Sequence, residues 1–134
     1  MSNEDDLMTI RKMCDAYGVT PRALRFYESK ELLSPIRQGT RRLFTRRDRA
    51  RLKLILRGKR FGFSLEEIRQ LLDLYDVGDQ QVTQLARTYE VASRHLNDMV
   101  RQRTELDEAI TELKEQLAWC ERRLVELNVH SAAE

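Results

Sequence analysis

The sequence has few of the residues that interrupt helices or cross-link a chain. It contains two prolines, five glycines and two cysteines among 134 residues. Cys14 and Cys120 lie far apart and in no CxxC-type pair, so neither a disulfide framework nor a zinc ribbon is expected. No apolar run approaches the roughly 18 residues that a transmembrane helix needs, and the acidic start Met1–Asp6 does not resemble a signal peptide. The sequence therefore predicts a cytoplasmic, mainly α-helical protein with no membrane partner.

Charge of one sign is confined to one part of the chain. Residues 9–62 hold 16 Lys and Arg against 4 Asp and Glu, whereas residues 63–134 hold 8 against 15, and residues 1–8 hold three acids and no base. The net charge of +2 conceals this segregation. A basic region on a nearly neutral protein predicts that this region alone meets a polyanion.

The helix-start signal at Thr20-Pro21 is the strongest in the chain. Threonine can cap the free N–H groups of a first turn, and proline at the first helical position loses no hydrogen bond. We expect a helix over about residues 21–29. Its residues Ala23, Phe26 and Tyr27 share one face and should bury, while Arg22 and Arg25 share another.

An earlier helix is predicted over Ile10–Tyr17, with Thr9 as its cap. Gly18 suits the left-handed end of that helix. Two short helices joined by a glycine turn, the second with a basic face, are typical of a helix-turn-helix that binds duplex DNA. An ordinary helical corner with solvated arginines is the alternative.

The segment from Ser34 to Phe44 has a different character, because Pro35 disfavours helix and Gly39 supplies a turn between two strand-like runs. We predict a short β-hairpin, or wing, beside the helix-turn-helix. Basic hairpins in this position commonly contact DNA phosphates. A surface loop is the alternative. The basic residues of this segment are Arg37, Arg41 and Arg42.

Two more helices are predicted from their capping boxes. Thr45 with Asp48 begins the first, which ends at Phe61-Gly62. Most of its eight basic residues should be solvated, and Arg60, near its end, is assigned to the DNA contacts. Ser64 with Glu67 begins the second, which should end near residue 76.

The last stretch has the clearest periodicity. Thirteen positions from Leu85 to Leu127 alternate in steps of four and three, and only Arg103 among them is polar. This pattern predicts a coiled-coil seam on a helix over residues 80–128, roughly 70 Å long. So long a helix has no partner of similar length within the chain, and a homodimer is the simplest solution. The dimer contacts are assigned to Leu85, Tyr89, Leu96, Met99, Arg103, Leu106, Ile110, Leu113, Leu117 and Leu124.

Four regions follow: a disordered leader (1–8), a DNA-binding domain (9–77), the coiled-coil helix (80–128) and a frayed tail (129–134). Cys120 lies within the seam, where a single thiol is a packing group rather than a metal ligand, because metals need two or more soft ligands. We expect no metal and no cofactor. The helical core offers no Cys/His pair, so the chain is not expected to be an enzyme.

Several short motifs follow one another in a recognisable order. Together they resemble the MerR family of bacterial transcription regulators, closely over residues 8–77 and in architecture beyond. The motifs are Met8-Thr9-Ile10, Gly18-Val19-Thr20, Leu24-Arg25-Phe26-Tyr27-Glu28, Leu32-Leu33, Arg42-Leu43-Phe44 and the octapeptide Phe61 to Ile68. The resemblance implies a winged helix-turn-helix DNA-binding domain, a second helix pair acting as another wing, and a long C-terminal dimerisation helix that forms an antiparallel coiled coil.

The resemblance also implies roles for single residues. Arg22 and Arg25 would lie at the major groove, Tyr27 would contact phosphate, and Arg42 would be the wing arginine. Thr9, Thr20, Arg41 and Arg60 complete the DNA contacts. The family often has tyrosine where Phe44 stands, and an aromatic residue where Arg41 stands.

Within the family, residues 48–74 most resemble the branch that controls branched-chain amino-acid and acyl-CoA degradation genes, so an effector could be a metabolite such as an acyl-CoA. The implied function is transcription regulation by a homodimer that binds an inverted-repeat promoter, distorts its spacer and acts on RNA polymerase. The alternative is a coiled-coil adaptor whose basic head binds RNA or an acidic partner, but exposed aromatics patterned for base stacking are missing.

Overall fold

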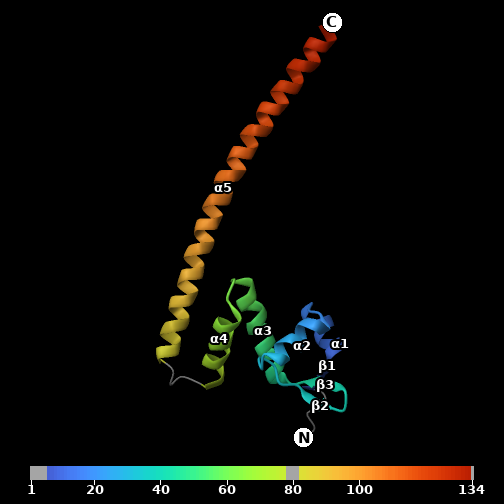
Figure 1. Ribbon diagram of the computed structural model, residues 1–134, viewed down its shortest axis with the longest axis vertical. Helices are drawn as coiled ribbons and strands as arrows, with labels where there is room; N and C mark the ends of the chain where they lie inside the picture. Colours follow the sequence, from blue (N-terminus) through green and yellow to red (C-terminus); the bar gives the residue numbers. More distant parts are fainter. Residues whose placement is uncertain (1–5, 78–81, 134) are drawn as a thin grey trace. The chain divides into compact units, whose positions relative to one another are not determined.

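A computed structural model describes residues 6–77 and 82–133, and shows the mainly α-helical chain that the sequence predicts (Figure 1). Predictions for residues 1–5, 78–81 and 134 lie outside the described residues. The elements, in chain order, are β1 (Met8–Thr9), α1 (Ile10–Tyr17), α2 (Pro21–Ser29), β2 (Ile36–Gln38), β3 (Arg41–Phe44), α3 (Arg46–Arg60), α4 (Leu65–Val77) and α5 (Val82–Ala133).

The chain separates into two compact units, Met1–Ala92 and Ser93–Glu134. This division falls within α5, whereas the sequence placed the boundary at residues 78–79. The first unit contains every residue assigned to DNA contact, and the second contains most of the predicted seam. Over the described ranges, no helix combines the length and the apolar character that crossing a membrane requires.

The helix-turn-helix forms as predicted, because local caps fix both of its helices. The Thr9 hydroxyl accepts from the Lys12 N–H at 3.2 Å, and the Thr20 hydroxyl accepts from the Ala23 N–H at 3.0 Å. Gly18 ends α1 at φ +66°, a left-handed conformation that favours glycine, and its N–H donates to the Cys14 carbonyl.

The predicted hairpin is confirmed, and it belongs to a three-stranded antiparallel sheet in the order β1-β3-β2. Within the hairpin, Arg37 faces Arg42 across the strands. The third strand was not predicted: Met8 pairs with Phe44, and Thr9 pairs with Leu43. Met8 therefore belongs to the sheet, and the assignment of a disordered leader as far as residue 8 was wrong. A strand of two residues is too short to leave an alternating pattern in the sequence.

The core of the first unit lies where α1, α2, β3, α3 and α4 meet. On α2, the prediction for Tyr27 was right and that for Phe26 was wrong, because Phe26 is 43% exposed. Leu24 takes its place in the core, since Leu24 and Tyr27, three residues apart, face the same side of the helix. The fully buried members of this core include Met13, Leu24, Leu32, Phe44, Leu52, Ile55 and Ile68.

Both predicted capping boxes are present. At α3, the Asp48 N–H donates to the Thr45 hydroxyl and the Thr45 N–H donates to the Asp48 carboxylate, each at 3.1 Å. At the start of α4, Ser64 and Glu67 make the equivalent pair of bonds. Helices α3 and α4 then pack closely, because a Cβ added at Gly58 would lie 2.8 Å from Ile68 Cγ1.

Helix α5 is continuous over 52 residues, or about 78 Å at 1.5 Å per residue. It extends to Ala133, so the frayed tail predicted after Asn128 is instead helical as far as that residue. The seam residues are exposed in the single chain. Among those at least 41% exposed are Leu85, Tyr89, Leu96, Met99, Leu106, Ile110, Leu113, Leu117, Leu124 and Leu127.

Candidate nucleic-acid interface

The exposed face of α2 carries Arg22, Arg25, Phe26 and Ser29. Pro21 and the Thr20 cap set the start of the helix, and the burial of Leu24 and Tyr27 sets its rotation. This rotation turns both arginines outward, as the sequence predicted. An arginine fork on an exposed helix can donate two parallel hydrogen bonds to the edge of guanine or to a phosphate.

A hollow of about 450 Å³ lies beside α2, between this helix and the α3–α4 pair. Its lining includes Arg22, Phe26, Tyr27 and Lys59. The ammonium of Lys59 lies 5.8 Å from the centre of the Tyr27 ring, which is a cation–π distance. Arg22 and Lys59 therefore bring two positive charges from different helices to one concave surface, which suits a phosphate group.

The structure places Tyr27 mainly in the core, since only 2% of the residue is exposed. Any phosphate contact by Tyr27 would therefore have to be made by its hydroxyl, because the ring is buried. The sequence missed Lys59, because many basic residues surround it in α3 and nothing in their spacing distinguishes one from another.

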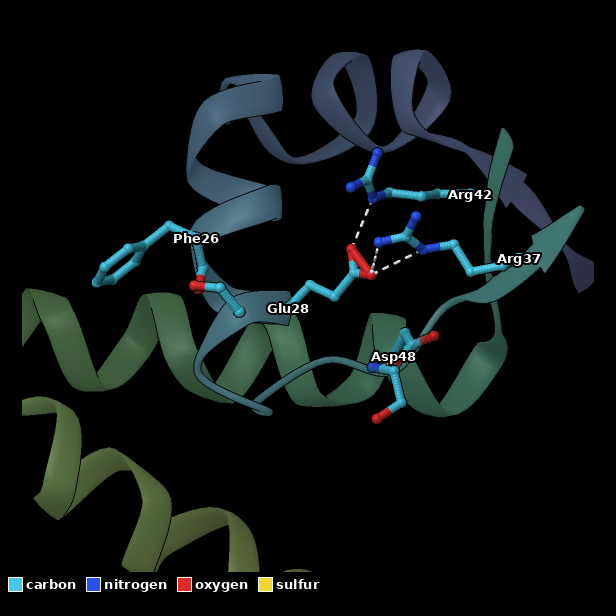
Figure 2. A network of polar contacts seen from close by, with 7 residues as sticks. Phe26, Glu28, Arg37, Arg42 and Asp48 are labelled. Atoms are coloured by element: carbon cyan, nitrogen blue, oxygen red, sulfur yellow. Dashed lines mark hydrogen bonds and ion pairs between the residues drawn. The ribbon is translucent and has the colours of Figure 1, made fainter. Parts of the chain in front are cut away.

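Glu28 connects α2 to the hairpin (Figure 2). Its Oε1 accepts from Arg42 Nε at 2.6 Å, and its Oε2 accepts from Arg37 Nη2 at 2.9 Å and from Arg37 Nε at 3.1 Å. The side chain of Glu28 is only 17% exposed and that of Arg42 is 21% exposed. One carboxylate thus holds both strands of the hairpin at a fixed position beside α2.

We call Glu28, Arg37 and Arg42 the Glu28 clamp, and the hairpin arginines differ in their contacts with it. Arg42, the predicted wing arginine, uses its Nε on Glu28, whereas Arg41 is exposed. Arg37 donates to the same carboxylate, although the sequence did not assign it to the DNA contacts. Glu28 lies within the motif Leu24–Glu28, but its role could not be inferred because both of its partners are at least nine residues away.

The clamp should depend on pH. Burial by itself would raise the pKa of Glu28, but hydrogen bonds from Arg42 and Arg37 and their positive charges outweigh it and lower the pKa. A carboxyl whose pKa is lower in the folded state stabilises the fold above its unfolded pKa of about 4.3, and this stability is lost as the pH falls through the folded value.

We therefore expect Glu28→Gln to lose about 1–2 kcal/mol of stability at pH 7, where the charged hydrogen bonds are intact. The difference between wild type and variant should shrink below pH 4. Urea unfolding at a series of pH values measures it, with the exposed Glu31→Gln as control. A difference that stays constant between pH 7 and pH 3 would show that the carboxylate charge does not hold the hairpin.

Asp48 anchors the base of the hairpin, where both of its strands adjoin α3. Asp48 is 2% exposed, and its carboxylate accepts from the Ser34 N–H at 2.9 Å as well as from Thr45. Ser34 precedes β2 and Thr45 follows β3, so Asp48 ties both ends of the hairpin to α3. The capping box was predicted, but the bond from Ser34 was not.

The remaining assigned residues are distributed around this surface. Thr9 and Thr20 use their hydroxyls as helix caps, and Arg60 is exposed at the end of α3.

Burial and the nearby Asp15 raise the pKa of the Cys14 thiol, although Arg25 acts in the opposite direction. Among the residues that the structure describes, no three His, Cys, Asp or Glu side chains form a group that could hold a metal ion.

Comparison with known families gives two matches. The model described as "MerR HTH family regulatory protein" matches residues 8–74, and the model described as "MerR, DNA binding" matches residues 49–116. Together they span α1–α4 and about the first two-thirds of α5.

Individual relatives agree. The HTH-type transcriptional regulator HmrR of Rhizobium leguminosarum bv. viciae is 32% identical, and the match covers 92% of this chain and 85% of that protein. The mercuric resistance operon regulatory protein of Shigella flexneri is also 32% identical, over 92% of this chain and 83% of that protein.

Solved structures show the same fold. A MerR family transcriptional regulator from Bacillus cereus matches with a TM-score of 0.65 and 25% identity, over 81% of this chain and 78% of that one. HiNmlR, a MerR family regulator lacking the sensor domain and crystallised bound to promoter DNA, matches with a TM-score of 0.58 and 24% identity, over 72% of this chain and 74% of that one.

Proposed function

This chain belongs to the MerR family of helix-turn-helix transcription regulators, and we propose that it binds an inverted-repeat promoter as a homodimer and regulates transcription by distorting the promoter spacer. Arg22 and Arg25 are exposed on a recognition helix to which Glu28 fixes a basic hairpin. This arrangement supports the proposal, because exposed arginines on a helix can donate to base edges and arginines of an adjoining hairpin can donate to phosphates.

The proposed dimer uses the exposed apolar seam of α5. An apolar stripe of this length is a feature of protein–protein contact rather than of a free surface. Charge along the helix favours the antiparallel arrangement, since residues 82–103 contain four Arg against two acids and residues 104–128 contain seven acids against three bases. Two identical heads related by a two-fold axis would then require an inverted repeat.

Distortion of the spacer would bring the −35 and −10 elements to a spacing that RNA polymerase can use. Bending a site of 20–30 base pairs costs of the order of 1–6 kcal/mol, and phosphate contacts from both wings can offset it. An effector, of which an acyl-CoA is the kind that the branch resemblance implies, would act by binding one dimer geometry more tightly than the other.

In-vitro transcription tests this mechanism, with the native promoter and with one whose spacer lacks two base pairs. We expect the shortened promoter to fire without the protein and to be only repressed by it, because its elements are already correctly spaced. If both promoters respond identically, the protein acts by occluding polymerase and not by distortion.

The arginines should have separable roles. Arg25→Ala is expected to cost about 1–3 kcal/mol and to relax the preference at one or two base pairs of each half-site. Arg41→Ala should weaken binding to every sequence alike and lower the slope of log K against log[salt] by about one. Binding to a library of duplexes at several salt concentrations measures both effects. An unchanged base preference in Arg25→Ala would remove that residue from the base contacts.

A further inference from the structure

One face of α3 carries a row of positive charge that the proposed DNA contacts do not use. Arg46, Arg49, Lys53 and Arg57 recur at steps of three, four and four, which places them in line along the helix. We call these four residues the basic track. Arg46, Lys53 and Arg57 are exposed and Arg49 is partly so.

The basic track lies on the face of α3 that points away from the core. Helix α3 buries Leu52 and Ile55 in the same core that receives Leu24 and Tyr27 of α2. At 100° per residue, Lys53 and Arg57 point roughly opposite to these buried positions. No described residue lines both the hollow beside α2 and the hollow at the track, so the track is a surface distinct from the one that carries Arg22.

The positive charges of the track repel one another and so destabilise the folded chain. Arg49, Lys53 and Arg57 are like charges at i, i+4 spacing, and Arg46 and Arg49 lie in the first turn of α3, where the helix dipole disfavours cations. Asp6 accepts from Arg46 at 2.9 Å, and its carbonyl accepts from Arg49. Within the described ranges, Lys53 and Arg57 form no ion pair. Such a cost is offset when an anionic partner binds.

The groove at the track indicates what kind of anion this is. A hollow of about 360 Å³ is lined by the four track residues together with Tyr17, Ala50 and Leu54. Tyr17 and Leu54 are partly buried against the core, so they offer an aromatic and an aliphatic surface beside the cations. A DNA backbone has little apolar surface to bury there. An acidic amphipathic helix offers both carboxylates and apolar side chains.

We propose that the basic track and its groove form a docking site for an acidic amphipathic segment of another protein, which binds while α2 holds DNA. Carboxylates of the segment would pair with Lys53 and Arg57, and its apolar side chains would cover Leu54 and Tyr17. The docking site uses none of the residues assigned to the dimer or to the DNA contacts, so it would let the DNA-bound regulator recruit or be recruited by a partner.

The test uses the full-length protein and a labelled synthetic 18-residue helix with glutamates on one face and leucines on the other. A scrambled peptide of the same composition and a non-specific duplex serve as further probes. The double variant Lys53→Ala/Arg57→Ala removes the unpaired half of the track. The double variant Arg87→Ala/Arg94→Ala removes the same charge from exposed positions on α5. The variant Ala50→Glu places an acid in the groove itself.

The double variant Lys53→Ala/Arg57→Ala should bind the helical peptide about tenfold more weakly, which corresponds to about 1.4 kcal/mol for two charge pairs. Ala50→Glu should have an effect of similar size. The α5 control should stay within about twofold, and binding to the native promoter fragment should be unchanged in all variants.

Equal binding of the scrambled peptide would overturn the proposal, because it would reduce the track to a general attraction for acids. The proposal would also be overturned if the protein did not bind the helical peptide and the double variant Lys53→Ala/Arg57→Ala lost binding to the duplex. The track would then be a second DNA surface. Thermal melts of each variant distinguish these outcomes from unfolding.

Discussion

Replacing Ile110 by glutamate is expected to convert the protein to monomers and to weaken promoter binding by about 100- to 10,000-fold. Ile110 lies near the middle of the proposed seam and is 41% exposed in the single chain. In the dimer it would be covered, so the variant would bury an unpaired carboxylate, which is strongly unfavourable. The loss in binding follows because two linked heads gain a factor of this size over one.

Analytical ultracentrifugation and promoter titration measure the two effects. Thr111→Glu is the matched control, because it adds the same charge at the neighbouring exposed position, off the seam. It should remain dimeric and should bind the promoter within a few-fold of wild type. If Ile110→Glu stays dimeric at micromolar concentration, the predicted seam is not the dimer interface.

The second large effect is expected at Asp48. Replacing it by alanine should lower the free energy of unfolding by about 3 kcal/mol. The change leaves the Ser34 N–H, the Thr45 N–H and the Thr45 hydroxyl without their acceptor, and each unsatisfied buried donor costs about 1–3 kcal/mol. Two of these donors can regain water when the hairpin loosens, so the loss should fall below the sum of the three.

Urea unfolding at a fixed protein concentration measures this, because a dimer's stability depends on concentration. The midpoint should fall while the slope stays the same. Asp15→Ala, at an exposed position of α1, should change stability by less than about 0.5 kcal/mol. Asp48→Asn keeps one acceptor oxygen and should lie between these two variants. Equal stability of Asp48→Ala and wild type would show that the hairpin does not depend on this carboxylate.

Asp48 also has a functional consequence in this scheme. It fixes the two ends of the hairpin to α3, and Glu28 fixes the middle of the hairpin to α2. Loosening either carboxylate should weaken binding to all DNA sequences, since the hairpin is proposed to contact phosphates. The base preference proposed for Arg25 should be retained.

The sequence by itself determined the elements whose stabilising contacts are local. Thr20 and Thr45 bond to N–H groups three residues ahead, so the starts of α2 and α3 were predicted to within a residue. The turn at Gly39 and the 3.5-residue period of α5 are likewise properties of neighbouring positions. The motif order led to the MerR family in the same way, because a motif is a local pattern.

Only the tertiary structure decided which side chains meet across long separations. Glu28 reaches Arg42 from 14 positions away, and Asp48 reaches Ser34 over the same separation. The rotation of α2, which exposes Phe26 and buries Leu24, is set by the core that four other elements complete. A helix cap depends on hydrogen bonds within one turn, and an apolar repeat depends on side chains within one or two turns. The Glu28 clamp and the buried face of α2 depend instead on how separate elements pack together. No short stretch of sequence contains that information.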